Sequence, residues 1–156
     1  MFPILSDPAI YEFENAPPAS QAWLDQRVAR LESRRSANGG EQWLNWVIRL
    51  PSGELAGYVQ ATVTGERVAC IAYELASKFW RRGIGSAAVG AMLAELGTNY
   101  GVSTFVAILK ARNVRSAAFL RYLGFSAERP VGLTPIGHET DELVMYKVHV
   151  CDQNAG

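Results

Sequence analysis

A short basic, glycine-rich loop near the middle of the 156-residue chain could bind an anion. Its sequence, SKFWRRGIG, places Lys78, Arg81 and Arg82 just before Gly83 and Gly85. The apolar run before the loop predicts a buried strand, and the apolar spacing after it predicts a helix. Unpaired N–H groups at a helix N-terminus favour phosphate oxygens, and glycine lets a phosphate approach them closely. The pattern therefore predicts a site for a pyrophosphate.

Three kinds of phosphate-binding loop compete for this pattern. A Walker loop would end in Gly-Lys-Ser/Thr, which is absent. A dinucleotide-binding fold is nearer, because Gly83, Gly85 and Ala88 satisfy G-x-G-x-x-A by letter. In that fold, however, the strand runs straight into the first glycine, and an acidic residue follows about 20 positions on. Here SKFWRR intervenes and residues 101–106 contain no carboxylate. A nicotinamide-dependent oxidoreductase is kept only as an alternative.

The third kind is the coenzyme A loop of the GNAT acetyltransferase superfamily. The run FWRRGIGSAAVGAML resembles it, together with NVRSAAFLRYLGF downstream. The family loop is Q/R-x-x-G-x-G/A, and residues 80–85 match it except that Trp80 holds the first position. A Trp there resembles the branch that acetylates the N-termini of ribosomal proteins. The resemblance covers residues 18–148 and is strongest over 68–125. It implies an N-acetyltransferase that uses acetyl-CoA.

The resemblance also implies which residues contact acetyl-CoA. In the family, two parallel strands splay apart to admit the pantetheine arm, and the first of them carries a bulge, expected here near residues 74–76. The expected contacts are Leu75 and Ser77 through their backbones, the loop residues Arg81, Arg82, Gly83, Ile84, Gly85 and Ser86, and Asn113 and Phe119 on the second helix. Asn113 could instead be only a helix cap. No metal ligands are expected.

Acetyl transfer from a thioester to an amine needs a neutral amine, oxyanion stabilisation and a proton for the departing thiolate. Glu74 is the expected base, because it is the only carboxylate in an apolar strand and lies next to the expected thioester position. It could instead be an exposed strand-end carboxylate near Lys78. His138 and Asp141 are weaker candidates. The N–H near Leu75 is the expected oxyanion donor.

The proton donor departs from the family pattern. Many members carry Tyr seven residues after the Asn, where this chain has Leu120. Tyr122 points about 200° away around the helix and cannot simply replace it. Ser116 lies one turn before Leu120 on the same side and is the expected donor, although a packing role would suit it equally. The missing Tyr keeps open a second function, a coenzyme A-binding sensor without catalysis.

The elements predicted around this site form an α+β fold: a mixed, mostly antiparallel sheet with a splayed parallel strand pair and helices on both faces. In chain order they are a helix over 21–35 capped by Ser20, strands over 42–50, 55–64 and 68–75, the crossover helix, a strand over 103–109, a helix over 114–123 and a closing strand over 143–150. The loop before the last strand is expected to border the acceptor pocket. Residues 1–17 are expected to be irregular, with at most one short helix over residues 9–13. Either the first edge strand of the family is missing or the natural start lies upstream.

Length and composition fit a single domain over residues 1–156, which the resemblance makes an acetyltransferase domain, with a frayed tail at 151–156. A formal net charge of zero argues against a protein that coats nucleic acid. Cys70 and Cys151 make no disulfide framework, which favours a reducing cytoplasm. No apolar run approaches the ~20 residues of a membrane span. The expected partner is a small-molecule or peptide amine, and a homodimer is left open.

Overall fold

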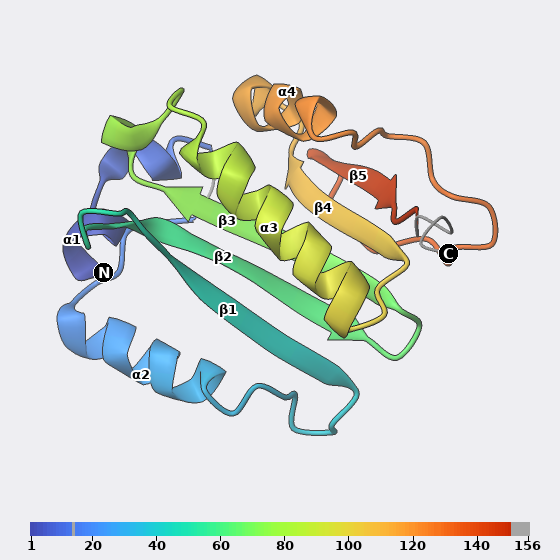
Figure 1. Ribbon diagram of the computed structural model, residues 1–156, viewed down its shortest axis with the longest axis horizontal. Helices are drawn as coiled ribbons and strands as arrows, with labels where there is room; N and C mark the ends of the chain where they lie inside the picture. The colour runs from blue at the N-terminus through green and yellow to red at the C-terminus, as the bar shows by residue number, and fades with distance from the viewer. Residues whose placement is uncertain (14, 151–156) are drawn as a thin grey trace.

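A computed structural model describes residues 1–13 and 15–150, and its centre is one five-stranded sheet (Figure 1). The strands lie in chain order across the sheet: β1 (Glu41–Arg49), β2 (Leu55–Thr64), β3 (Val68–Leu75), β4 (Thr104–Lys110) and β5 (Glu142–Val148). β3 and β4 run parallel, and the other neighbours run antiparallel. The predicted mixed, mostly antiparallel α+β sheet is confirmed. The tail predicted to fray, which includes Cys151, lies outside the described residues.

The helical elements are α1 (Phe2–Leu5), η1 (Pro8–Tyr11), α2 (Gln21–Leu31), η2 (Ser77–Phe79), α3 (Ile84–Asn99) and α4 (Val114–Tyr122). Ser20 caps α2 as predicted, because its hydroxyl accepts the Trp23 N–H at 3.1 Å. The helix ends at Leu31 rather than at residue 35. Arg34 has a positive φ of 57°, which breaks the helix, and its carbonyl then accepts the Trp43 N–H of β1 at 2.8 Å.

The N-terminal residues form α1 where the family resemblance would call for a strand. In the described part of the chain, β1 is therefore the edge of the sheet. α1 contacts β2, and η1 follows it toward the end of β3. The segment expected to be irregular thus contains two short helical turns, and Asp7 between them binds Ser77 just after the end of β3.

Alternation along the strands assigns side chains to two layers. Val59 and Ile71 pack into the main core with Leu96 of α3 and Leu120 of α4. The neighbouring strand positions, such as Tyr58, point to the opposite face, where Arg27 of α2 lies near enough to influence the Tyr58 hydroxyl. α3 and α4 therefore share one face of the sheet, and the N-terminal helices approach the other. This confirms the prediction of helices on both faces.

β3 and β4 diverge after three paired positions, from Val68↔Thr104 to Cys70↔Val106. β3 continues to Leu75 on β2, and β4 continues to Lys110 on β5, so a gap opens between them. The predicted splay of the parallel pair is confirmed. α3 is the crossover helix that such a parallel connection requires.

The predicted bulge near residues 74–76 is wrong. The register of β3 with β2 is unbroken through Gly57↔Leu75, and the shift in this sheet lies in β1 between Ile48 and Arg49. Gly57 explains the close fit, because a Cβ there would lie 2.0 Å from the carbonyl oxygen of Glu74. The backbone groups of β3 are exposed to the gap by the splay itself, and no bulge is needed.

Among the described residues, no helix combines the length and the apolarity needed to cross a membrane.

Candidate active site

The glycine-rich loop leads into α3, and the first turn of that helix presents its backbone N–H groups to solvent. Gly83 is the N-cap, with a positive φ of 76°, and no side chain caps the helix. A Cβ on Gly83 would project into open space, and one on Gly85 would make only ordinary contacts with Phe119 and Leu75. The unpaired N–H groups and the positive end of the helix dipole therefore face a space with room for an anion.

The two loop arginines lie differently. Arg81 lines the cleft beside the loop and has a positive φ of 58°. Arg82 is exposed and does not line the cleft, because its guanidinium stacks over the Phe79 ring at 5.6 Å. Both groups add positive charge beside the α3 N-terminus, where an anion would be stabilised.

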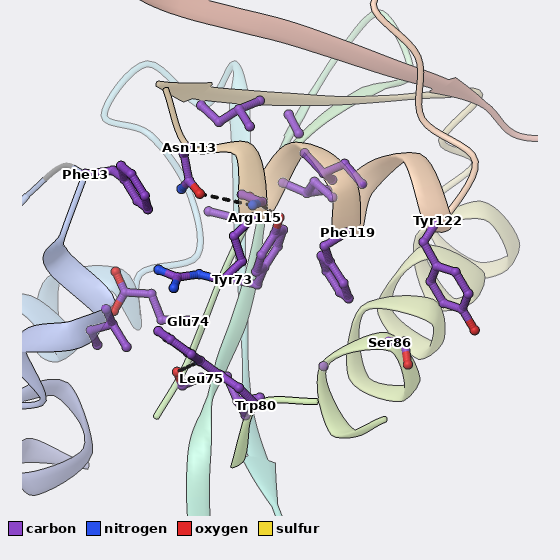
Figure 2. Close-up of a pocket in the computed structure, with 18 of the residues that line it drawn as sticks. Phe13, Tyr73, Glu74, Leu75, Trp80, Ser86, Asn113, Arg115, Phe119 and Tyr122 are labelled. Atoms are coloured by element: carbon purple, nitrogen blue, oxygen red, sulfur yellow. Dashed lines mark hydrogen bonds between the residues drawn. The ribbon is translucent and has the colours of Figure 1, made fainter. Parts of the chain in front are cut away.

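A cleft of about 580 Å³ extends from this loop, through the gap between β3 and β4, to the N-terminal segment. Figure 2 shows Ser86 and Tyr122 toward one end and Phe13 and Glu74 toward the other. α4 forms the roof of the cleft with Asn113, Arg115, Ser116 and Phe119. The cleft therefore joins the N-terminus of α3 to a second end, beside Phe13 and Glu74, which is built separately.

Two consecutive residues of β3 point to opposite sides of the sheet at the gap. Tyr73 faces α4, where its hydroxyl lies 2.6 Å from Ser116 Oγ and its ring meets Phe119 edge-on at 5.1 Å. Glu74 faces the other way, opposite Tyr58 on β2. Both side chains nevertheless line the same cleft, because it passes through the sheet. An acceptor and a donor could therefore meet there from different faces.

The carboxylate of Glu74 affects two tyrosines beside it. Burial, and then the charge of Glu74, raises the pKa of Tyr58 well above its usual value. Burial and the same carboxylate raise the pKa of Tyr11 to about 12. Glu74 is partly buried rather than exposed, and the nearby Lys78 pairs with Glu54.

Leu75 turns its backbone toward the gap. The Ala76 N–H donates to the Ala56 carbonyl at 2.9 Å, which makes these two residues a hydrogen-bonded pair of the β2–β3 ladder. Neighbouring positions in an antiparallel ladder alternate, so the Leu75 N–H and C=O point away from β2. The carbonyl accepts the indole N–H of Trp80 at 2.8 Å. The Leu75 N–H faces the gap, where the sequence predicts an oxyanion donor.

The N-terminal segment is anchored to the end of β3 by one carboxylate. Oδ2 of Asp7 accepts the Ser77 N–H at 2.8 Å and the Ser77 hydroxyl at 2.6 Å. These two hydrogen bonds lower the pKa of Asp7. The Ser77 N–H, predicted to bind pantetheine, is therefore engaged within the protein, and Ser77 does not line the cleft.

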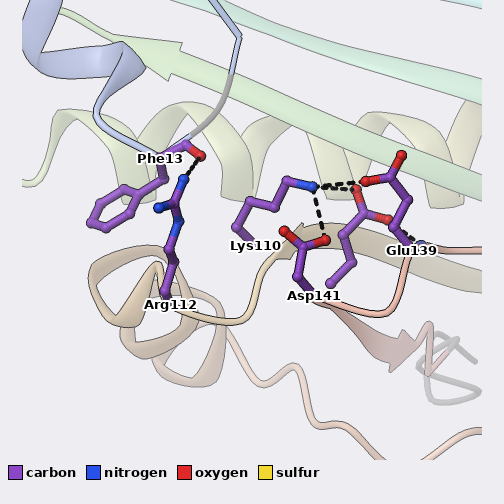
Figure 3. Close-up of polar contacts among 6 residues, drawn as sticks. Phe13, Lys110, Arg112, Glu139 and Asp141 are labelled. Carbon is purple, nitrogen blue, oxygen red and sulfur yellow. Dashed lines mark hydrogen bonds and ion pairs between the residues drawn. The ribbon is translucent and has the colours of Figure 1, made fainter.

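Two arginines of the α4 region hold the other end of the segment. Arg112 donates to the Phe13 carbonyl at 2.8 Å (Figure 3). Arg115 pairs with Glu12 at 3.1 Å, and its guanidinium stacks over Trp80 at 4.1 Å and Phe13 at 5.5 Å. Residues nearly one hundred positions apart in sequence thus close this end of the cleft.

The loop before β5 packs elsewhere. Lys110 binds Glu139 and Asp141, each at 3.0 Å, and these bonds raise the pKa of Lys110 and lower that of Asp141 (Figure 3). Leu133 and Ile136 pack under the sheet, and no cleft-lining residue comes from this loop. The loop expected to border the acceptor pocket therefore adds no residue to this cleft, and His138 and Asp141, the weaker candidates for the base, lie outside its lining.

One sequence comparison decides the family. The family model described as an acetyltransferase (GNAT) domain matches residues 1–126. This chain belongs to the GNAT acetyltransferase family. A search of curated proteins finds no match for this GNAT domain.

Solved structures agree with the fold. The domain is similar to a spermidine N-acetyltransferase from Vibrio cholerae in complex with CoA and spermine, with 16% identity, a TM-score of 0.72, and 94% of this chain and 86% of that chain covered. It is also similar to a phosphinothricin acetyltransferase from Sinorhizobium meliloti in complex with AcCoA, with 18% identity, a TM-score of 0.66, and 94% and 80% covered. An aminoglycoside acetyltransferase in complex with coenzyme A has 20% identity, a TM-score of 0.72, and 94% and 86% covered. At these identities the likeness concerns the fold.

The residues predicted for this GNAT domain are largely brought together. Those that line the cleft are Glu74, Leu75, Arg81, Gly83, Gly85, Ser86, Asn113, Ser116 and Phe119. Arg82, Ile84 and Ser77 do not line it, although the backbone of Ile84 begins α3. Asn113 has both roles that the sequence left open: its side chain caps α4 by accepting the Ser116 N–H at 3.0 Å, and it also lines the cleft.

Three residues that shape the GNAT cleft were missed: Tyr73, Arg115 and Phe13. Alternation along β3 could have drawn attention to Tyr73, since it shares a face with Ile71 and Leu75. No local signal marks Phe13 or Arg115, because their contacts cross most of the chain. The family match also removes the basis for the dinucleotide alternative, which rested on three letters.

Proposed function

We propose that this GNAT domain is an acetyl-CoA-dependent N-acetyltransferase that transfers the acetyl group directly to an amine within a ternary complex. The single observation that carries the proposal is the cleft, which joins the uncapped N-terminus of α3 to Glu74 through the splayed strands. The residues present fit coenzyme A, since the space beside Gly83 is open and the gap beside Leu75 exposes backbone groups.

The bound thioester would supply an acyl carbon to which the amine nitrogen bonds as the carbon–sulfur bond breaks, with one proton leaving the amine and one reaching the sulfur. Glu74 would accept the proton of the amine, directly or through a water, from the face of the sheet opposite α4. The Leu75 N–H would stabilise the developing negative charge on the oxygen. Neither role needs a protein nucleophile, so Cys70 is left as a half-buried packing residue.

Ser116 would return the proton to the sulfur. Its hydroxyl is hydrogen-bonded to Tyr73, which fixes its position and offers a second proton carrier behind it. Leu120, which holds the position of the family tyrosine, is 1% exposed and lines the cleft, and its hydrocarbon side chain has no proton to donate. Tyr73 lies on β3 and Ser116 on α4, and together they could supply the proton that the family tyrosine would give to the departing thiolate.

Trp80 supports a more specific proposal. Its indole N–H holds the Leu75 carbonyl, and its ring supports Arg115. Trp80 is also the residue on which the resemblance to the branch that acetylates the N-termini of ribosomal proteins depends. We therefore propose a peptide amine as one acceptor class. We also propose a cytoplasmic location, for which the half-buried thiol of Cys70 is the one supporting feature.

A thiol-release assay tests the proposal. Wild-type protein with acetyl-CoA and a panel of amines should release thiol in proportion to acetylated amine. Clear binding of coenzyme A without turnover of any amine would favour the alternative, a sensor without catalysis, which the buried Leu120 keeps open. The Glu74→Gln variant separates the two, because an enzyme would lose turnover and keep coenzyme A affinity.

A further inference from the structure

The acceptor end of the cleft carries few charges. Among the described residues that line the cleft, Glu74 is the one carboxylate, and Arg81 and Arg115 are the cations. Two acids of the N-terminal segment do not line the cleft and bind other residues: Glu12 pairs with Arg115, and Asp7 binds Ser77. One amine can therefore pair with one carboxylate at this end.

The surroundings of Glu74 do not favour a second positive charge. The positive charge of Arg27 lowers the pKa of both Tyr11 and Tyr58, the two tyrosines beside the Glu74 carboxylate. The Arg27 guanidinium therefore lies near these tyrosines. Arg115 lies at the other side of this end of the cleft (Figure 2). An acceptor with several ammonium groups would bring at least one of them into a partly dry cleft without a carboxylate, which is costly.

The walls around Glu74 are apolar and aromatic. Ile10 and Phe13 of the N-terminal segment and Trp80 of the loop line the cleft, and Figure 2 shows Phe13 and Trp80 on either side of Glu74. Phe13 is half-buried and held in place twice, by Arg112 on its carbonyl and by Arg115 on its ring. A fixed ring beside a single carboxylate suits a ligand with an apolar body and one amine.

We propose that the acceptor is a primary amine with one positive charge on an aromatic or branched aliphatic body, and that Phe13 determines this specificity. The inference rests on the proposed acetyl transfer and narrows its acceptor. It separates this protein from relatives that bind polyamines, such as the Vibrio cholerae enzyme in complex with spermine.

The test compares kcat/KM for 2-phenylethylamine and for spermidine at saturating acetyl-CoA. Wild type should favour 2-phenylethylamine by at least about tenfold. Phe13→Ala should lower kcat/KM for 2-phenylethylamine about tenfold through KM, with kcat and coenzyme A affinity unchanged. Phe13→Leu should lower kcat/KM for 2-phenylethylamine by a smaller factor than Phe13→Ala. Thermal melting of each variant checks the fold, and Phe13→Leu keeps the test open if Phe13→Ala is unstable.

A gain of function sharpens the test. Ile10→Glu adds a second carboxylate to the lining of the cleft and should shift the preference toward spermidine about tenfold. Val131→Glu adds the same charge at a fully exposed position outside the cleft and should leave the preference unchanged.

The outcomes are distinct. A wild-type preference for spermidine, or equal losses of both substrates in Phe13→Ala, would overturn the specificity proposal while acetyl transfer stands. Bound acetyl-CoA with no amine acetylated would overturn the proposed function, and the specificity proposal with it.

Discussion

The two ends of the cleft are built in different ways. The end that we propose for phosphate is one continuous stretch, in which the loop and the first turn of α3 supply backbone N–H groups beside Gly83 and Gly85. The acceptor end is assembled from Phe13, Glu74 and Arg115, which belong to three separate segments. Local geometry fixes the first end, and tertiary contacts fix the second. We therefore expect substitutions at the two ends to separate cofactor binding from acceptor use.

The largest expected effect is on chemistry at the acceptor end. Glu74→Gln keeps the shape of the side chain but removes the base, so kcat should fall about 10²–10³-fold. Coenzyme A affinity, measured by calorimetry, should stay within about twofold of wild type. Glu54→Gln is the matched control, since Glu54 is exposed and pairs only with Lys78 in the described contacts. A kcat of Glu74→Gln equal to that of wild type would show that Glu74 is not the general base.

The phosphate end should respond in the opposite sense. Gly83→Val forces a β-branched residue into a left-handed conformation and directs its side chain toward the space expected to hold phosphate. Coenzyme A affinity should fall about 100-fold. Gly90→Val, on the next turns of α3 where a Cβ also meets open space, is the matched control and should bind normally. Unchanged affinity in Gly83→Val would contradict the phosphate assignment.

The Tyr73–Ser116 pair lies between the two ends, and its effect should be smaller. Ser116→Ala and Tyr73→Phe should each lower kcat about tenfold, and the double variant should lose little more, because the two hydroxyls act as one unit. Thiol-release rates under single-turnover conditions give the measurement. Fully additive losses would argue that the hydroxyls act independently. A thioester with a more acidic thiol should reduce the defect, since its thiolate needs less help to leave.

The smallest effect concerns the anchor of the N-terminal segment. The folded-state pKa of Asp7 is lowered by its bonds to Ser77, so the ionised carboxylate stabilises the protein above its unfolded value of 3.8, and this contribution is lost as the pH falls below that value. Asp7→Asn should therefore have a lower melting temperature than wild type at pH 7, and this difference in melting temperature should become smaller toward pH 3. Asp25→Asn, at an exposed position of α2, is the control. A difference in melting temperature that stays constant with pH would mean that the charge of Asp7 does not contribute to stability.

The same contrast explains what the sequence could predict. The strands, α3, the cap by Ser20 and the loop at Gly83 depend on residues close together in the chain, and their patterns are strong. The position of the N-terminal segment depends on pairs such as Arg112 with Phe13, whose partners carry no local signal. For the same reason the sequence did not indicate that the loop before β5 lies outside the lining of the cleft, where Lys110 binds it through Asp141.

The bulge in β3 and the end of α2 were predicted wrongly for a different reason. Both depend on single backbone positions, Gly57 and Arg34, whose consequence appears only when a neighbouring strand is packed against them. Gly57 lies too close to Glu74 for any side chain, so the register of β3 is fixed by contact rather than by propensity. Tertiary contact overrides local preference at such positions.

A crystal structure with acetyl-CoA tests the central claim most directly. The account predicts the diphosphate against the N–H groups at the start of α3, beside Gly83, and the thioester in the gap between Leu75 and the Tyr73–Ser116 pair. A diphosphate bound elsewhere, or an acyl group that does not enter the gap between β3 and β4, would contradict it.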